Sequence, residues 1–311
     1  MRDAWKYSSP IFDSLTHIGG FEDISEMIKI EKEFGVSKQI GIVHNEEGFQ
    51  IAREQYPQRF VFAKYLSLSD IAKYNVEPVL AEISKLQDQG YVLAKSWFGP
   101  RWRDYIKGVP KDFRINHPRL DPIFQALEDN GIPLIIHIGD PDTYYASQYQ
   151  DSEKYGTKEE HLKQLEGVLS SHPKLIFQIP HFGSQPEIHR LPDLANWMNK
   201  FPNFIIDTAS SRWMARELSK NPEKAREFII KYSDRILFGT DVSPNRGDYH
   251  YFSGRYLAQR ILWETNERNS PLPFPDPDTE NTGGTYINGL DLPLSVLKKL
   301  YWENANQNYT K

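Results

Sequence analysis

Short runs of apolar residues recur along the chain, separated by longer stretches in which apolar residues have the spacing of a helix. Eight of these runs are rich in β-branched and aromatic residues, and several are apolar at consecutive rather than alternate positions. Continuous apolar runs of this length are typical of parallel strands that are covered on both faces. The runs lie at 10–15, 38–44, 59–66, 90–97, 132–139, 174–180, 203–209 and 234–241.

The stretches between these runs predict helices. The clearest helical patterns lie at 79–90, 121–131, 161–173 and 222–234, and each ends at Gly or Pro or at the Asp before the next strand. Eight strands that alternate with helices predict a single-domain (β/α)8 barrel over residues 1–311, with its active site at the C-terminal ends of the strands. A doubly wound open sheet is the alternative, but it usually has fewer strands and a glycine-rich phosphate loop.

One segment departs from this alternation. Residues 271–293 are rich in Pro, Gly and Asp, which disfavour a helix. We expect a long surface loop after the eighth strand, of the kind that caps a barrel mouth. A flexible linker is the alternative, although only a short final helix is expected after it.

Composition restricts the possible partners. The net charge of -5 and the pI near 6.0 disfavour a nucleic-acid partner, so a small-molecule substrate is expected. The chain has no cysteine, so a metal would need His, Asp or Glu ligands. No phosphate-binding glycine motif is present, which predicts no nucleotide cofactor. No leader or membrane-spanning run is evident, which predicts a cytoplasmic protein without a membrane partner; a homo-oligomer is compatible with the sequence.

Chemically active side chains gather where the predicted strands end. Four of the nine histidines lie at or just beyond a strand end, and the last two strands add an aspartate each. These residues are His17, His44, His137, His181, Asp207 and Asp241. Imidazole and carboxylate groups at one barrel mouth indicate a metal site or an acid–base site. A single histidine here could instead be structural, and Asp207 could cap the helix expected near Arg212.

The order of these motifs resembles the amidohydrolase-related family of TIM-barrel hydrolases and decarboxylases. That family includes aminocarboxymuconate semialdehyde decarboxylase and several sugar and dicarboxylate lactonases. The resemblance covers nearly the whole chain, and its most specific parts are Gly-Thr-Asp at 239–241 and Glu-Asn-Ala at 303–305. The matching segments are IFDSLTH, PLIIHIG, IPHFGS, RILFGTDVSP and WENANQNY.

The resemblance implies a role for each matching residue. His17, His137 and Asp241 would hold a divalent metal such as Zn or Mn, and Asp241 would also accept the proton of the attacking water. His181 matches the sixth-strand histidine, and we expect it to polarise the substrate carbonyl or to bind the intermediate. Without a metal, His17 and His137 would hydrogen-bond the substrate instead. Leu15 stands where the family has the first histidine of its His-x-His pair. This departure argues against two metals and leaves one or none.

Cationic and aromatic side chains after the fourth and seventh strands suggest how a substrate binds. Lys95, Arg101 and Arg103 follow one strand with two tryptophans, and Arg212 follows the other beside Trp213. Arginine binds carboxylates bidentately and aromatic rings stack on sugars, so a carboxylated or sugar-like substrate is expected. The expected substrate contacts are Lys95, Arg101, Arg212 and His44. Solvated loop arginines and an internal salt bridge of Lys95 are the structural alternatives.

These observations lead to one preferred function and two alternatives. The preferred function is hydrolysis of a small carbonyl compound, most simply a lactone or related ester of a sugar or dicarboxylic acid, by water that Asp241 activates. The first alternative is metal-dependent nonoxidative decarboxylation. The second is a catalytically inactive barrel that binds a small molecule, for which Leu15 is the best argument.

Overall fold

The computed structural model describes residues 5–18, 24–244 and 247–310. All eight predicted strands are present, and they pair in sequence order into one eight-stranded sheet in which every pair is parallel. The strands are β1 (Ile11–Ile18), β2 (Val36–Val43), β3 (Phe60–Tyr65), β4 (Tyr91–Trp97), β5 (Leu134–His137), β6 (Phe177–Ile179), β7 (Phe204–Asp207) and β8 (Ile236–Leu237).

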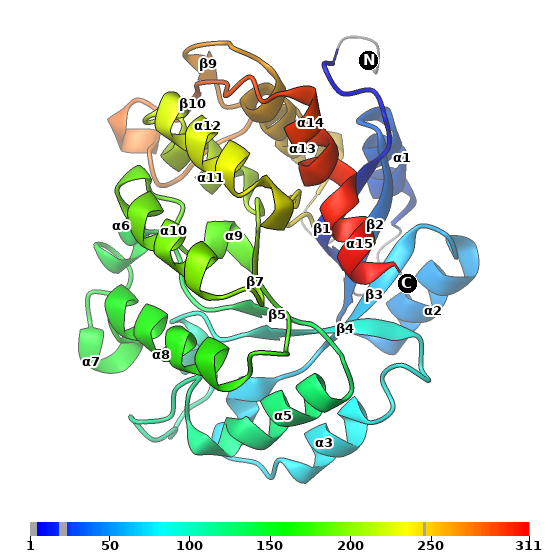
Figure 1. Ribbon diagram of the computed structural model, residues 1–311, viewed down its shortest axis with the longest axis vertical. Helices are drawn as coiled ribbons and strands as arrows, with labels where there is room; N and C mark the ends of the chain where they lie inside the picture. The colour runs from blue at the N-terminus through cyan, green and yellow to red at the C-terminus, as the bar shows by residue number, and fades with distance from the viewer. Residues whose placement is uncertain (1–4, 19–23, 245–246, 311) are drawn as a thin grey trace.

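The first and last strands meet and close the barrel. Backbone N–H groups of Ser14 and His17 donate to the carbonyls of Phe238 and Val242, at 2.7 and 2.8 Å. The N–H of Asp241 donates in return to the carbonyl of Leu15 at 2.9 Å. Helices surround the strands (Figure 1), so the predicted (β/α)8 barrel is confirmed.

The four predicted helices are also present, although α3 (Glu77–Ile83) is shorter than expected because a turn that ends at Gly90 leads directly into β4. No helix in the described part of the chain has both the length and the apolar character that crossing a bilayer requires. The other longer helices are α1 (Ser25–Glu33), α2 (Glu46–Gln55), α5 (Asp121–Asp129), α8 (Lys158–Ser171), α10 (Leu191–Lys200), α11 (Ser211–Leu218), α12 (Pro222–Lys231), α13 (Tyr249–Glu264), α14 (Leu294–Lys298) and α15 (Asn304–Tyr309). Four single-turn helices are α4 (Trp102–Tyr105), α6 (Asp142–Tyr145), α7 (Ser152–Tyr155) and α9 (Pro180–Gly183).

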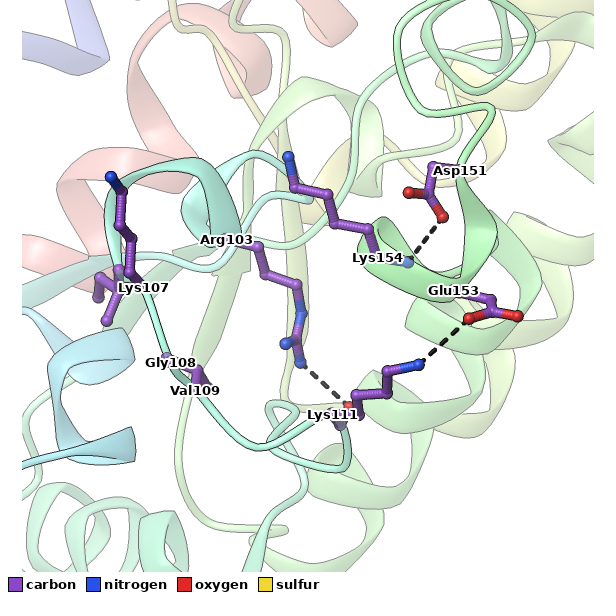
Figure 2. A pocket seen from close by; sticks show the side chains of 9 residues that line it. Arg103, Lys107, Gly108, Val109, Lys111, Asp151, Glu153 and Lys154 are labelled. Carbon is purple, nitrogen blue, oxygen red and sulfur yellow. Dashed lines mark hydrogen bonds and ion pairs between the residues drawn. The ribbon is translucent and has the colours of Figure 1, made fainter.

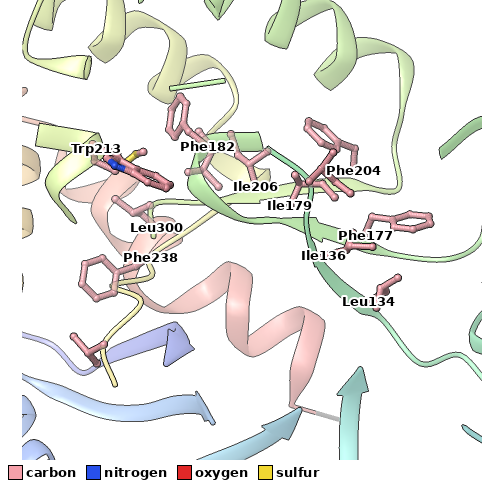
Figure 3. Packing of buried hydrophobic residues seen from close by; sticks show 14 of the residues in the cluster. Leu134, Ile136, Phe177, Ile179, Phe182, Phe204, Ile206, Trp213, Phe238 and Leu300 are labelled. Atoms are coloured by element: carbon pink, nitrogen blue, oxygen red, sulfur yellow. The ribbon is translucent and has the colours of Figure 1, made fainter. Parts of the chain in front are cut away.

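The apolar core has two layers, one outside the barrel and one inside it. Between strands and helices, Ile136, Phe177 and Phe204 pack in the larger cluster (Figure 3). Leu15 belongs to the smaller inner cluster, where it is fully buried with Leu93 and other strand residues. The side chain of Leu15, for which the resemblance implied a histidine position, therefore fills the barrel interior.

Residues 271–293 form a structured loop rather than a flexible linker. The short strands β9 (Ser270–Pro271) and β10 (Tyr286–Ile287) pair in an antiparallel arrangement. Between them, the buried Asp276 accepts hydrogen bonds from Arg216 of α11 at 3.3 and 3.4 Å. Because α11 follows β7, the loop is fixed at the C-terminal face of the barrel, as expected for a segment that caps the mouth.

Asp13 joins the first strand to the segment that carries Asp241. Its fully buried carboxyl accepts hydrogen bonds from the N–H of Thr240 at 3.1 Å and from the hydroxyl of Tyr256 at 2.8 Å. The Tyr256 hydroxyl also lies 3.2 Å from Glu31 Oε1, so a single hydroxyl proton faces two carboxyl groups. Burial raises the pKa of Asp13 to about 7, against the opposing effect of the Thr240 hydrogen bond.

Asp13 should therefore make the protein less stable as pH rises from about 4 to about 7. The folded chain binds this proton more tightly than the unfolded chain, so the free energy of unfolding falls by about 4 kcal/mol across this range. In Asp13→Asn, the new side chain has the same shape and is always neutral. The stability of this variant should therefore lack this part of the pH dependence. Urea unfolding at pH 5, 6 and 7 measures the free energy of unfolding of the wild-type protein and of the variant. If this free energy depended on pH in the same way in both proteins, the prediction would be wrong.

Candidate active site

The predicted site residues meet at the C-terminal end of the barrel in two hydrogen-bonded groups. His17 lies near the end of β1, and His137 is the last residue of β5. His181 and Asp241 follow β6 and β8. The strand ends therefore bring together residues that are up to 224 positions apart in the sequence.

The first group contains Asp241 and two histidines. His17 Nε2 lies 3.0 Å from Asp241 Oδ1, and its Nδ1 lies 2.7 Å from His44 Nε2. Asp241 adopts a left-handed backbone conformation, with φ of 60°. Burial acts to raise the pKa of Asp241, but the hydrogen bond and charge of His17 outweigh it and hold this pKa well below its usual range. Asp241 is therefore ionised and available as a base at neutral pH.

The second group contains His181, His137 and Asp140. His181 Nδ1 lies 3.1 Å from the carbonyl oxygen of Ala209, so this nitrogen carries the proton. Burial, reinforced by the charge of His137, lowers the pKa of His181 to about 3, so its ring is neutral and Nε2 is an acceptor. This Nε2 accepts a hydrogen bond from His137 Nδ1 at 3.0 Å.

The remaining nitrogen of His137 faces a carboxylate. His137 Nε2 lies 2.9 Å from Asp140 Oδ1, and Tyr149 donates its hydroxyl proton to the other oxygen of Asp140. Burial acts to raise the pKa of Asp140, but the charge and hydrogen bond of His137 outweigh it and lower the pKa. Because the carboxylate only accepts, both ring nitrogens of His137 carry protons in this arrangement. His137 is thus an imidazolium paired with Asp140.

His181 sits in a strained turn. His181, Phe182 and Ser184 have φ of 58°, 58° and 59°, so non-glycine residues on both sides of Gly183 are left-handed. Each such residue costs about 1–2 kcal/mol relative to right-handed backbone. Asp207 stabilises the turn, because its Oδ1 accepts from the N–H groups of His181 and Ala209 at 3.2 and 2.9 Å. Asp207 therefore does not cap α11, whose N-cap residue is Ser210.

Lys95 is a buried cation without a fixed partner. Its side chain is 5 % exposed, and no residue in the described ranges forms a hydrogen bond or ion pair with its ammonium group. Burial lowers the pKa of Lys95 to about 8, while the charges of Asp241 and Asp207 act to raise it. Within the described residues, the internal salt bridge considered for Lys95 is thus not formed. The ammonium group remains able to donate to a bound molecule.

A cavity of about 290 Å³ opens beside these groups. Three of the predicted residues line it, namely Asp241, Arg101 and Arg212, while the histidines and Lys95 are not in its wall. Ser211 Oγ and Trp213 Nε1, both from lining residues, are buried and lack a hydrogen-bond partner within the described residues. The wall therefore combines an ionised carboxylate with cationic and neutral donors.

Arg212 is held at the cavity rather than extended into solvent. Its guanidinium donates to the hydroxyl of Tyr144 at 2.9 Å and lies 3.4 Å from Asp276 of the capping loop. Arg101 is more exposed and lies 3.7 Å from Asp104. The solvated-loop alternative is therefore wrong for Arg212.

Arg103 organises its own loop. It donates to the carbonyls of Pro110, Lys111 and Phe113 and lines a second cavity (Figure 2). In that cavity the exposed Lys111 pairs with Glu153 at 3.1 Å. Asp140 and Asp241 line the first cavity and not the second, so the acid–base chemistry belongs to the first.

Several residues of the site were not predicted from the sequence. Asp140 follows His137 by three positions in the same strand-end segment, and this proximity could have identified it. Tyr149 and Ser211 are buried, and no sequence pattern distinguishes them from other tyrosines and serines of the chain. Their roles follow from the tertiary contacts alone.

The arrangement does not fit a three-ligand metal site. His17 directs Nε2 at Asp241, both nitrogens of His137 are hydrogen-bonded, and Leu15 is an apolar side chain buried in the barrel interior. Among residues 5–18, 24–244 and 247–310, no three His, Asp or Glu side chains are grouped so that they could hold a metal ion. A catalytic zinc normally needs three such ligands.

Comparison with solved structures supports the fold. A protein from Pseudomonas putida described as a 2-pyrone-4,6-dicarboxylic acid hydrolase has a TM-score of 0.57 and 10% identity, over 96% of this chain and 97% of its own. The 5-carboxyvanillate decarboxylase of Novosphingobium aromaticivorans, in complex with manganese, has a TM-score of 0.55 and 16% identity, over 93% and 81%. A zinc-bound amidohydrolase from Burkholderia multivorans has a TM-score of 0.53 and 10% identity, over 97% and 99%.

Sequence comparison identifies the family. No curated protein matches the chain. The family model described as amidohydrolase matches residues 97–310, which include all the later strand ends of the site. Family membership and the retained acid–base groups argue against the inactive barrel considered above. The chain belongs to the amidohydrolase family and is an enzyme of that family.

Proposed function

We propose that the protein hydrolyses a lactone or related ester of a dicarboxylic or sugar acid. The observation that carries this proposal is the buried ammonium of Lys95, which has no hydrogen-bond partner within the described residues and interacts electrostatically with the ionised Asp241. Ester hydrolysis needs a base for water and a positive group for the developing oxyanion. Asp241 and Lys95 supply these two functions.

In the proposed reaction, Asp241 accepts a proton from water as the oxygen attacks the substrate carbonyl. His17 orients the Asp241 carboxylate through its hydrogen bond to Oδ1. Lys95 stabilises the oxyanion. The only ring N–H of His181 is bound to the Ala209 carbonyl, so His181 does not polarise the substrate carbonyl as the sequence predicted; it holds the protonated His137 at the site. As the intermediate collapses, the C–O bond of the ring breaks and Asp241 passes the proton that it accepted from water to the leaving oxygen. The ring thus opens to a hydroxy acid and Asp241 is again a carboxylate.

The cavity wall favours a substrate that carries a carboxylate or several hydroxyl groups. Arg101 and Arg212 supply guanidinium groups, and Ser211 and Trp213 add two buried donors that lack partners within the described residues. Unpaired buried donors cost free energy, so a bound acceptor oxygen is favoured here. His44, beside His17, is a further candidate contact.

The proposed steps use no metal, because the donor set does not fit one. A single zinc or manganese ion at His17, His137 and Asp241 was the alternative from the family resemblance. We expect hydrolysis to continue after dialysis against EDTA. Loss of activity with EDTA and its recovery with added Zn or Mn would favour the metal-bound site.

The test is a panel of lactones with matched controls. Sugar lactones, a pyrone dicarboxylate and simple neutral esters are incubated with the protein, and acid release is followed at constant pH. Turnover of a carboxylated or polyhydroxylated lactone, with none of neutral esters, is the expected result. Absence of turnover across the panel, with and without metal, would refute the proposed function.

Nonoxidative decarboxylation is the second candidate, and one observation favours it. The imidazolium of His137, paired with the cavity residue Asp140, could protonate the carbanion that remains after CO2 leaves. Release of CO2 from aromatic carboxylates, measured in the same panel, distinguishes this reaction from hydrolysis.

A further inference from the structure

The C-terminal segment WENANQNY contributes a residue that none of the steps above uses. Tyr309 is the last residue of α15, and its side chain is 2 % exposed. The neighbouring Asn304 anchors the helix, because its side-chain amide donates to the carbonyls of Ser233 and Ile236 at 2.7 and 2.8 Å. This anchoring accounts for the Asn of the Glu-Asn-Ala motif and leaves the Tyr309 hydroxyl to be explained.

A chain of buried hydrogen bonds leads from Tyr309 to the active site. The Tyr309 hydroxyl donates to Gln178 Oε1 at 2.8 Å, inside the barrel. Gln178 Nε2 donates to Asp207 Oδ2 at 2.7 Å and to the carbonyl of Ser14 at 3.2 Å. Asp207 Oδ1 then accepts from the backbone N–H of His181. Gln178 and Asp207 are both fully buried.

The direction of each bond is fixed by chemistry. The Asp207 carboxylate can only accept, so the Gln178 amide must present its nitrogen to it. The amide oxygen then needs a donor on the opposite side, and the Tyr309 hydroxyl supplies one. Without that hydroxyl, the buried amide oxygen loses a partner and the amide orientation is less well defined.

We infer that Tyr309 is a positioning residue for the acid–base site: through Gln178 and Asp207, its hydroxyl holds His181 in the left-handed turn that presents the imidazole to His137. Strained backbone persists only where surrounding contacts over-determine it. Asp207 accepts from the N–H of His181 in this turn and from the N–H of Ala209, and the carbonyl of Ala209 accepts from the His181 ring. The inference rests on the proposed function only in assigning the pair of His181 and His137 to catalysis.

The test replaces the hydroxyl and reads the histidine ring directly. Tyr309→Phe retains the aromatic ring, and Tyr232→Phe is the matched control, since Tyr232 is also buried but bonds to Ala195 and Asn199 between surface helices. Long-range proton–nitrogen NMR spectra of 15N-histidine protein are recorded without substrate. We expect the ring signals of His181 and His137 to shift in Tyr309→Phe and to remain unchanged in Tyr232→Phe.

Kinetics and a second variant complete the experiment. On a lactone that the protein turns over, Tyr309→Phe should lower kcat about tenfold and leave KM within twofold, because it misplaces the hydrogen-bonded pair of His181 and His137 without removing a cavity contact. Gln178→Met breaks the same chain one step nearer His181, so it replaces Tyr309→Phe if that variant does not fold. In the Gln178→Met background, Tyr309→Phe should add no further effect.

Two results would overturn the inference. One is unchanged His181 ring signals in a folded Tyr309→Phe or Gln178→Met variant. The other is additive effects of the two substitutions, which would mean that Tyr309 does not act through Gln178. Because the spectra need no substrate, a failure of lactone hydrolysis would refute the proposed function and leave this inference standing.

Discussion

Asp241→Asn is expected to lower kcat for lactone hydrolysis by about 10²–10⁴-fold, which is the usual contribution of a general base. The amide has the size of the carboxylate but cannot accept the proton of the attacking water. His17 can still meet the amide oxygen at the Oδ1 position, so the fold and the cavity should be preserved. Initial rates and circular dichroism of the two proteins measure the effect and check the fold.

The control for this variant lies at the other end of the same strand. Asp234 is exposed before β8 and pairs with Lys299 at 2.6 Å, so Asp234→Asn makes the same chemical change far from the mouth. It should leave kcat within twofold. Undiminished hydrolysis in Asp241→Asn would show that another group activates water, and the proposed mechanism would be wrong.

Lys95→Met should lower kcat/KM by about 10²–10³-fold, as loss of one oxyanion-stabilising donor usually does. Methionine keeps much of the length and apolar stem of lysine and removes the charge. Burial lowers the pKa of Lys95 to about 8, so wild-type activity should also fall as pH rises through about 8. The pH–rate profile of Lys95→Met should lack this alkaline fall.

Lys64→Met provides the matched comparison. Lys64 lies on the neighbouring strand β3 and pairs with Glu82 at 3.1 Å, away from the histidine groups. Its loss should change neither the rate nor the pH profile. If Lys95→Met retained the alkaline fall, the titrating group would be another residue and Lys95 would not be the oxyanion donor.

The barrel itself was predictable from the sequence because its strands are continuous apolar runs. A parallel strand that is covered on both faces must be apolar along most of its length. Each strand of the barrel can therefore be recognised from its own segment of the sequence. Element ends were less predictable, as α3 shows by ending at Ile83, because short-range turn contacts decide where a helix stops. The capping position of residues 271–293 was expected, but its contact with Arg216 was not.

The site was only partly predictable. Strand-end histidines and Asp241 were identified because a barrel gathers its strand ends at one face. The pairing of His137 with Asp140 and of His17 with Asp241 decides which nitrogen carries a proton, and that information exists only in three dimensions. Whether a metal ion can bind beside Leu15 likewise depends on the directions in which the candidate ligand side chains point. The sequence does not give these directions.

The sequence by itself determined the (β/α)8 fold, the face that carries chemistry and the residue types available there, since periodicity and strand ends are local properties. The tertiary structure alone decided that Lys95 is buried without a hydrogen-bonding partner in the described chain, and that Tyr309 reaches His181 through Gln178 and Asp207. Burial and hydrogen-bond direction depend on contacts between residues that are far apart in the sequence, such as His17 and Asp241, which are 224 positions apart. No local pattern of residues encodes such contacts, because they arise only when the strands close into a barrel.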